Sequence, residues 1–469
     1  MIKNNNIGEG MIKISKKSNL LENETYHYEL HNPQKPNLYE DVFNYNHIPK
    51  VAFNHRTVPK SMPEKIYITD TTFRDGQQAI TPYTVEQIKT LYKFMSKLGG
   101  KKGIIRQTEF FAYSEKDKRA IKECQDLGLE FPEITTWIRA SKEDFKLVKD
   151  LNIKETGILL SCSDYHIYNK MGLDRKKALD KYLGIVKDAF SVGIRPRCHL
   201  EDITRADYYG FVLPLVHELQ KLSNEAGIPV KIRACDTMGY GVPYSEAALP
   251  RSVAGIIYGF QYYADLPSEM IEWHGHNDFY LGVANASTAW LYGAGAVNCS
   301  LLGIGERTGN IPLEAMVMQY ASLKGTLNGM DTTVITDIAN YYREELNYDI
   351  PPMTPFVGEY FNVTRAGIHA DGLNKNERIY NIFNTEKFLK RPVGVMITNT
   401  SGLAGISYWL NQKFDLKGDN CIDKHDSLCV EMKKLIDTEY ENGRQTAMTD
   451  LELLEMVKKL AKGRFVFEI

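Results

Sequence analysis

The sequence predicts an α/β protein built as a (β/α)8 TIM barrel, followed by a small, mostly α-helical C-terminal subdomain. Three observations lead to this prediction. Eight short β-branched runs alternate with helix-length amphipathic stretches over about 260 residues, which is the count and length of a TIM barrel. No Gly-rich phosphate-binding fingerprint follows the first run, which disfavours an open doubly wound sheet. The alternation stops near residue 325.

Each barrel element is assigned from the spacing of its apolar residues. Apolar residues that recur every three to four positions indicate helices, and short β-branched runs indicate strands. The predicted strands, in chain order, are residues 66–72, 104–109, 133–138, 157–161, 195–201, 230–237, 270–278 and 296–304. The predicted helices between them include residues 85–98, 115–127, 175–190, 208–226 and 280–292.

This pattern divides the chain into three regions. Residues 1–62 are polar, rich in Asn, Tyr and His, and weakly periodic, so we expect an extension that wraps the barrel or lies loosely on it. Residues 63–325 are the predicted TIM-barrel catalytic domain. In residues 326–469 a helical stretch at 336–346 precedes the Pro-rich break IPPMTP and the motif GIHADG, and a charged helical tail follows.

Composition excludes several classes of partner. The formal net charge of −2 gives no reason to expect a nucleic-acid or membrane-surface partner. No stretch approaches the roughly 18 apolar residues of a membrane span, and the N-terminus lacks the apolar core of a signal peptide. The seven cysteines include no CxxC pair, which favours a reducing compartment. We therefore expect a cytoplasmic protein.

Polar motifs stand at three predicted strand ends, where TIM barrels collect their reactive groups. They are DTTFRDGQQ at 70–78, EWHGHND at 272–278 and GIGERTGN at 303–310. Strand side chains alternate between faces, so His274 and His276 project to the same side and can reach one ion. A carboxylate from Asp75 completes a metal-binding set. The alternative is a chance HxH pair, which the two neighbouring motifs make less favourable.

Other polar residues in the strands have two readings each. Arg74 adjoins the proposed metal and could polarise a carbonyl or enolate oxygen, or it could form a structural ion pair. Arg197, His199 and Glu201 share one face of strand five, either as a mutually satisfied core layer or as groups that position substrate and base. Thr237, at the end of strand six, could hydrogen-bond a substrate carboxylate, although a lone Thr is a weak signal.

These motifs together resemble one family. The ordered set DTTFRDGQQ, EDITRAD, DTMGYGVP, HGHND and GIGERTGN is similar to the metal-dependent acyltransferases that include the 2-isopropylmalate, homocitrate and citramalate synthases. The resemblance covers roughly residues 65–400. It implies a TIM barrel, a following helical subdomain, and a homodimer in which that subdomain reaches the partner's active site. It also implies a divalent metal, Mn²⁺ or Co²⁺ first, with Mg²⁺ or Zn²⁺ as alternatives.

The resemblance assigns roles to matching positions. Asp75, His274 and His276 would ligate the metal, and Asn310 would lie at or near it. Arg74 would contact the keto group, Thr237 would contact the substrate carboxylate, and Gln78, Glu109 and Arg197 would join the substrate-binding set. The remaining expected catalytic residues are Glu201 on the barrel and the subdomain pair His369 and Tyr380.

Departures from the family pattern suggest the substrate. The usual LRDGEQ is FRDGQQ here, so Gln77 replaces a glutamate near the metal, which should ease binding of a dianion. The long leucine-sensing domain is missing, because only about 70 residues follow position 400. The sequence is most similar to the Re-face-specific citrate synthases, which implies acetyl-CoA and oxaloacetate as substrates. Candidates for the distal carboxylate are Arg106, Arg139 and Arg233, each of which could instead form an ion pair elsewhere in the barrel.

Three alternatives remain open. The nearest is a homocitrate or citramalate synthase, with 2-isopropylmalate synthase less favoured. The second is a lyase that cleaves a 3-hydroxyacyl-CoA on the same barrel, against which the GIHADG region argues. The third is a catalytically silent barrel, which the intact set of candidate residues makes unfavourable.

Overall fold

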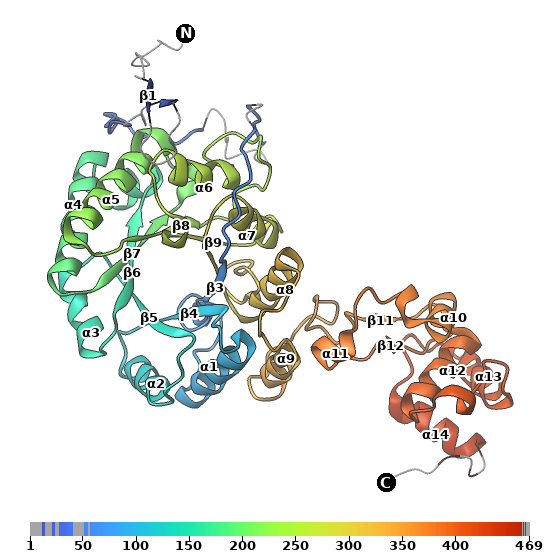
Figure 1. The fold of residues 1–469 in the computed structure, drawn as a ribbon. Coiled ribbons are helices and arrows are strands. Elements are labelled where there is room, and N and C mark those ends of the chain that lie inside the picture. Colours follow the sequence, from blue (N-terminus) through green and yellow to red (C-terminus); the bar gives the residue numbers. More distant parts are fainter. Residues whose placement is uncertain are drawn as a thin grey trace. The chain divides into compact units, whose positions relative to one another are not determined.

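The computed structural model describes residues 12–14, 21–23, 28–40, 51–54, 57–461, 463 and 465. The chain forms two compact units, Met1–Met330 and Asp331–Ile469. Figure 1 shows the barrel of the first unit and the helices of the second. Among the described residues, no helix is both long enough and apolar enough to cross a membrane.

The first unit contains a closed barrel of eight parallel strands (Figure 1). Their order around the barrel follows the chain, and β10 pairs with β3 to close it. The barrel prediction is therefore confirmed. The strands are β3 (Tyr67–Asp70), β4 (Ile105–Phe110), β5 (Glu133–Ile138), β6 (Glu155–Ser161), β7 (Arg195–Glu201), β8 (Lys231–Asp236), β9 (Ile271–Gly275) and β10 (Ala296–Cys299).

Two predicted strands end three or more residues earlier than expected. The predictions ran to residues 278 and 304, but β9 ends at Gly275 and β10 at Cys299. After β10 the backbone turns at Leu302, whose φ of +56° is incompatible with a strand. The polar ends of both motifs therefore lie on loops at the carboxyl ends of the strands, which is where a barrel places its site.

Helices cover the outside of the barrel. The predicted helix at 85–98 is α1, and its Thr84 and Gln87 form a capping box. The predicted helix at 208–226 begins with a π-helical segment, Tyr208–Val212, before α5. The outer helices are α1 (Val85–Gly99), α2 (Glu115–Gln125), α3 (Phe145–Asp150), α4 (Arg175–Ser191), α5 (Leu213–Ala226), α6 (Val253–Tyr262), α7 (Gly282–Leu291) and α8 (Leu313–Lys324).

One glycine inside the barrel makes room for the charged groups described below. A Cβ atom on Gly157, in β6, would lie 2.6 Å from Nε2 of His199 and 2.9 Å from Oε1 of Glu109. Both distances are shorter than normal carbon contacts, so the position requires a residue without a side chain. Gly157 thus lets the polar side chains of β4 and β7 approach the β6 backbone.

Part of the N-terminal extension contacts the barrel. β1 (Ile12–Ile14) and β2 (Leu21–Asn23) form an antiparallel pair. Within residues 28–40, the His31 carbonyl accepts from Arg175 at 3.0 Å and the Pro33 carbonyl accepts from the Tyr168 hydroxyl at 2.6 Å. Most of the other residues of the predicted 1–62 extension lie outside the described residues.

The second unit is mainly helical and has its own apolar core. Buried residues of this core include Ala370, Trp409, Met432 and Leu453. A short parallel pair joins β11 (Val363–Thr364) to β12 (Gly394–Val395). Its helices are α9 (Val334–Glu344), α10 (Gly367–Lys375), α11 (Thr385–Leu389), α12 (Gly402–Lys413), α13 (Ser427–Glu441) and α14 (Asp450–Leu460).

Candidate active site

A polar cavity of about 240 Å³ opens at the carboxyl ends of the barrel strands. Its wall includes both polar and aromatic side chains, with Phe111 and Trp137 on the aromatic side. The sequence-predicted residues that line it are Arg74, Asp75, Gln78, His199, Glu201, Thr237, His274 and His276. These residues come from strands far apart in the sequence, and barrel closure brings them together.

The loop after β3 carries Arg74 and Asp75, and it is fixed by buried hydrogen bonds. Asp70, the last residue of β3, accepts from the hydroxyls of Thr72 at 2.5 Å and Thr108 at 2.6 Å. The Thr72 hydroxyl in turn accepts from the backbone N–H of Leu301 at 2.9 Å. The ends of three neighbouring strands are thereby joined, so the RDG loop has little freedom to move.

Asp75, His274 and His276 could bind a single metal ion together. Among the described residues, they are the one group of three or more His, Cys, Asp or Glu side chains whose ligand atoms lie close enough to do so. Oδ2 of Asp75 lies 3.6 Å from Nε2 of His274 and 3.7 Å from Nε2 of His276. Two ligand atoms about 2.1 Å from one ion lie about 3.4 Å apart at a tetrahedral angle. The observed spacing is close to that value.

Unpartnered polar atoms at this place fit a cation. Oδ2 of Asp75 is buried and has no hydrogen-bond partner among the described residues, and the same holds for both side-chain polar atoms of Asn310. The backbone of Asn310 pairs with that of His276. The Asn310 side chain lies against Gly305, where an added Cβ atom would come within 2.7 Å of the Asn310 Cγ. Buried polar atoms without partners are costly unless a ligand satisfies them.

The electrostatics of the three side chains suit a cation as well. Burial raises the pKa of Asp75, but the charges of Arg74, His274 and His276 lower it to about 2. Burial lowers the pKa of His274 to about 3 and also lowers the pKa of His276. At neutral pH the site therefore holds one carboxylate and two neutral imidazoles, which are the ligand forms that divalent metals bind.

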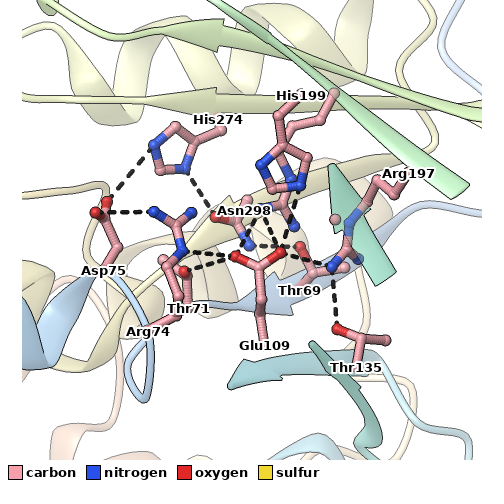
Figure 2. Close-up of polar contacts among 12 residues, drawn as sticks. Thr69, Thr71, Arg74, Asp75, Glu109, Thr135, Arg197, His199, His274 and Asn298 are labelled. Atoms are coloured by element: carbon pink, nitrogen blue, oxygen red, sulfur yellow. Dashed lines mark hydrogen bonds and ion pairs between the residues drawn. The ribbon is translucent and has the colours of Figure 1, made fainter. Parts of the chain in front are cut away.

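Arg74 has three neighbours at the edge of the cavity, and Figure 2 shows two of them, Asp75 and Glu109. Its Nε donates to Glu109 at 2.8 Å, and its Nη1 donates to Asp75 at 3.0 Å. Its guanidinium also lies 5.9 Å from the ring centroid of Trp137. The cation is thereby fixed next to the proposed metal ligands.

A layer of buried charges lies inside the barrel, and we define it as Glu109, Glu155, Arg197, Arg233 and Glu272. Nη2 of Arg197 donates to Glu109 at 2.8 Å. Arg233 binds both oxygens of Glu109, at 3.1 and 3.2 Å, and both oxygens of Glu272, at 2.9 and 3.1 Å. Figure 2 shows Glu109 between Arg74 and Arg197. Shared ion pairs of this kind keep buried charges compensated.

The buried charge layer includes two of the predicted substrate contacts. Glu109 and Arg197 are each no more than 1% exposed and are absent from the cavity wall. The charge of Glu109 is compensated by Arg197 and Arg233, and that of Arg197 by Glu109 and Glu155, which favours the core-layer reading of Arg197. Glu109 acts on the site indirectly, by holding Arg74.

The cations predicted for a distal carboxylate also lie elsewhere. Arg106 lies at the amino-terminal mouth of the barrel, stacked 4.1 Å from the ring centroid of Tyr67. Arg139 pairs with Asp144 and is 67% exposed, and Arg233 belongs to the buried charge layer. Arg307 was not among the predicted residues; it lines the cavity, and its guanidinium binds Asp278 at 2.8 Å.

Gln77 does not face the cavity, contrary to expectation. Its side chain is buried, donates to the Phe73 carbonyl at 2.6 Å and accepts from Lys116 at 3.3 Å. The Gln-for-Glu exchange in the RDGQQ motif therefore does not remove a charge from the cavity wall. It places a neutral amide beside a lysine instead.

Glu201 has a partner, His166, that was not predicted from the sequence. Its carboxylate accepts from Nδ1 of His166 at 2.9 Å and from the Ser161 hydroxyl. Burial raises the pKa of Glu201, but the bonds from His166 and Ser161 lower it to about 2. His166 lies on the π-helical segment Tyr165–Lys170 after β6, and its place in SDYH gave no signal of its own.

Thr237 lies where a substrate carboxylate could reach it. It lines the cavity, and its hydroxyl donates to the Cys235 carbonyl at 3.4 Å and accepts from the Asp202 N–H at 2.9 Å. Its own carbonyl accepts from Arg307 at 2.6 Å. The loop of the GERTGN motif is thus attached to the end of β8.

The two predicted residues of the second unit are in contact with each other. The ring centroids of His369 and Tyr380 are 4.4 Å apart. Nδ1 of His369 is 3.1 Å from the Thr364 hydroxyl, and Tyr380 is half exposed. The two side chains are therefore in contact, and their catalytic roles stay predictions.

Comparison with known proteins identifies the family. The HMGL-like family model matches residues 65–341, which is more than half of the chain. The chain belongs to the HMGL-like family. It is 55% identical to a citrate (Re)-synthase of Clostridium kluyveri over 93% of this chain and 96% of that protein. It is also 55% identical to a citrate (Re)-synthase of Syntrophus aciditrophicus, over 95% of this chain and 71% of that protein.

A third relative of this HMGL-like chain is more distant. It is the 2-phosphinomethylmalate synthase of Streptomyces hygroscopicus, 36% identical over 91% of this chain and 97% of that protein. The family membership predicted from the ordered motifs is confirmed, and so is the prediction that the chain is an enzyme of this family. The roles of the individual site residues stay predictions.

Proposed function

We propose that this chain condenses acetyl-CoA with oxaloacetate and water to give citrate and CoA. The observation that carries the proposal is the group of Asp75, His274 and His276 beside Arg74, in a chain that is 55% identical to two citrate (Re)-synthases over most of its length. The HMGL-like family is generally dependent on divalent metals, and the unpartnered oxygen of Asp75 fits one.

We assign Asp75, His274 and His276 as the residues that hold the metal, with Asn310 beside them. When bound, a divalent cation supplies the Lewis acidity that polarises a carbonyl oxygen. Mn²⁺ or Co²⁺ suits a site of two imidazoles and a carboxylate better than Ca²⁺, which prefers oxygen ligands alone. The choice between these metals is part of the proposal.

Arg74 stabilises the oxygen that gains negative charge when the enolate attacks the keto carbon. Its guanidinium is already oriented by Glu109 and Asp75, so no reorganisation is needed as the charge develops. The Thr237 hydroxyl, which points to the Cys235 carbonyl in this structure, can turn to a substrate carboxylate. Arg307 is the second arginine of the cavity wall, and we assign it to the distal carboxylate of oxaloacetate.

The base that removes the acetyl methyl proton is better sought in an imidazole than in Glu201. A carboxylate whose pKa is lowered to about 2 is a weak base. We assign proton abstraction to His369, with Tyr380 as its partner, and we infer a homodimer in which this pair serves the partner's cavity. Glu201 and His166 then hold the cavity wall and assist proton transfer from the barrel side. The cytoplasmic location expected from the cysteines stays a prediction.

The test is a substrate panel. CoA release from acetyl-CoA is measured with Mn²⁺ or Co²⁺, and oxaloacetate, 2-oxoglutarate, pyruvate and 2-oxoisovalerate are offered in turn. The Asp75→Asn variant is the matched control, because it removes one ligand charge with little change in shape. We expect oxaloacetate to give the highest kcat/KM by at least about tenfold, a difference of about 1.4 kcal/mol.

Two results would overturn the proposal. Preference for 2-oxoglutarate or pyruvate would point to a homocitrate or citramalate synthase, and no CoA release with any of the acids would remove the synthase assignment. The face of attack is tested separately, by degrading citrate made from labelled acetyl-CoA with a lyase of known facial selectivity. Label in the carboxymethyl arm of citrate that attack on the Si face would produce would contradict a Re-face reaction.

A further inference from the structure

His274 makes a hydrogen bond that points away from the proposed metal. Its Nδ1 is 2.8 Å from Oδ1 of Asn298, a residue of β10 that no motif singled out. Both side chains are buried, and the two residues face each other across the pairing of β9 with β10. Figure 2 shows Asn298 between His274 and Thr69.

Asn298 is itself held by a second bond, to Thr69 on β3. Nδ2 of Asn298 donates to the Thr69 hydroxyl at 2.9 Å, and the Thr69 hydroxyl donates to Oε1 of Glu272. All three residues are no more than 3% exposed. A continuous chain of hydrogen bonds therefore runs from His274 through Asn298 and Thr69 to Glu272.

Glu272 determines which atoms donate and which accept along this series of hydrogen bonds. Arg233 binds both carboxylate oxygens of Glu272, so that group is ionised and can only accept. The single proton of the Thr69 hydroxyl goes to Glu272, which leaves the Thr69 oxygen as an acceptor. That oxygen requires the amide NH₂ of Asn298, so the amide oxygen must face His274.

We infer that Asn298 and Thr69 are positioning residues that select the metal-binding tautomer of His274. The amide oxygen of Asn298 can only accept, so Nδ1 of His274 carries the proton and Nε2 keeps its lone pair. Nε2 is the atom that lies 3.6 Å from Oδ2 of Asp75, on the side of the proposed metal. The ring is therefore set to ligate before any metal arrives.

The two histidines differ in this respect. Nδ1 of His276 is buried and has no hydrogen-bond partner among the described residues. No neighbour therefore selects the tautomer of His276, whereas Asn298 selects the tautomer of His274. We assign His274 as the preorganised ligand and His276 as the one whose tautomer settles only when the metal binds.

This inference rests on the metal site of the proposed function, so the test must separate the two. The first readout needs no metal: the tautomer of His274 is read from long-range ¹H–¹⁵N correlations in metal-free protein with ¹⁵N-labelled histidine. The signals are assigned by their loss in a His274→Asn variant. The second readout is the Mn²⁺ dissociation constant, measured by calorimetry.

Thr69→Val is the variant that discriminates. It removes the hydroxyl that orients Asn298 while keeping a side chain of similar volume, so the amide is free to turn its NH₂ toward His274. Thr69→Ser retains the hydroxyl, and Thr136→Val removes another fully buried barrel hydroxyl, which donates to the Thr156 hydroxyl at 2.9 Å, between β5 and β6. Circular dichroism verifies that all variants are folded.

The expected outcome is the Nδ1–H tautomer in the metal-free wild type and a mixture in Thr69→Val, with Mn²⁺ bound about 10- to 100-fold more weakly by that variant. Thr69→Ser should restore the affinity to within about threefold, and Thr136→Val should not change it. An Nε2–H tautomer in the wild type, or a Thr69→Val protein with unchanged tautomer and affinity, overturns the inference. Failure of the wild type to bind Mn²⁺ at all would instead count against the proposed function.

Discussion

Replacement of Arg233 by Met tests whether the buried charge layer stabilises the barrel. Arg233 is fully buried and makes four hydrogen bonds of 2.9–3.2 Å to the carboxylates of Glu109 and Glu272. Met has a similar length but no charge, so the layer would lose one of its positive charges while both carboxylates stay buried. Removing one partner of a buried ion pair typically costs about 3–5 kcal/mol.

The remaining contacts do not compensate for this loss. Glu109 would keep Arg74 at 2.8 Å and Arg197 at 2.8 Å, but Glu272 would keep only Thr69 and the Nε of Arg197 at 3.7 Å. We therefore place the expected destabilisation at about 3–5 kcal/mol, which corresponds to a fall in Tm of about 6–20 °C for a barrel of this size. Most of the destabilisation would come from the buried, uncompensated charge of Glu272.

The assay is urea unfolding followed by tryptophan fluorescence. The chain has four tryptophans, and only Trp409 lies in the second unit, so a Trp409→Phe background leaves Trp137, Trp273 and Trp290 to report on the barrel. Arg139→Met is the comparison variant. Arg139 is 67% exposed, and the buried Asp144 would keep its hydrogen bond from the Tyr113 hydroxyl, so the loss should be smaller than for Arg233→Met. A loss below about 1 kcal/mol for Arg233→Met would show that the layer is not a stabilising unit.

Two further predictions concern pH and metal. Glu314 accepts from the Leu302 N–H at 3.1 Å, and burial raises its pKa from 4.5 to about 7. The stability that the protonated Glu314 contributes is therefore full below about pH 4.5 and is lost as pH rises through about 7. Glu314→Gln should be more stable than the wild type at pH 8 by about 3 kcal/mol, measured by urea unfolding. A urea midpoint of the variant equal to or lower than that of the wild type would contradict this. His276→Ala should abolish CoA release and lower metal retention measured by elemental analysis, with the far-ultraviolet circular dichroism unchanged; turnover that persists in metal-depleted buffer would refute the assigned ligands.

The metal group could be predicted from sequence because its key relation is local. His274 is on β9 and His276 directly follows its last residue, Gly275, so the alternation of the strand continued by one residue places both on one face. Asp75 could be added because the site of a barrel lies at the carboxyl ends of its strands. The barrel itself followed from the count and spacing of the βα units.

The partners of the charged residues could not be predicted, because barrel closure decides them. Arg197 and Glu109 are 88 residues apart in the chain, and only the closed sheet shows that they neutralise each other. Arg106 could have been excluded by register, since it is the second residue of β4 and so lies at the mouth opposite the site. His166 was missed because a π-helical segment, which has no clear sequence pattern, turns it toward Glu201.

The shared ion pairs of the buried charge layer restrict how this barrel can acquire a new substrate. Each carboxylate of Glu109 and Glu272 serves more than one arginine, so a single exchange within the layer leaves several neighbours uncompensated. Neutral drift through that layer would require several simultaneous changes. We call the uncharged side chains of the cavity wall the rim. They include Trp137, Leu159 and Gln78, and their exchange leaves no buried charge uncompensated. Libraries intended to change acid specificity should therefore vary the rim and leave the layer intact.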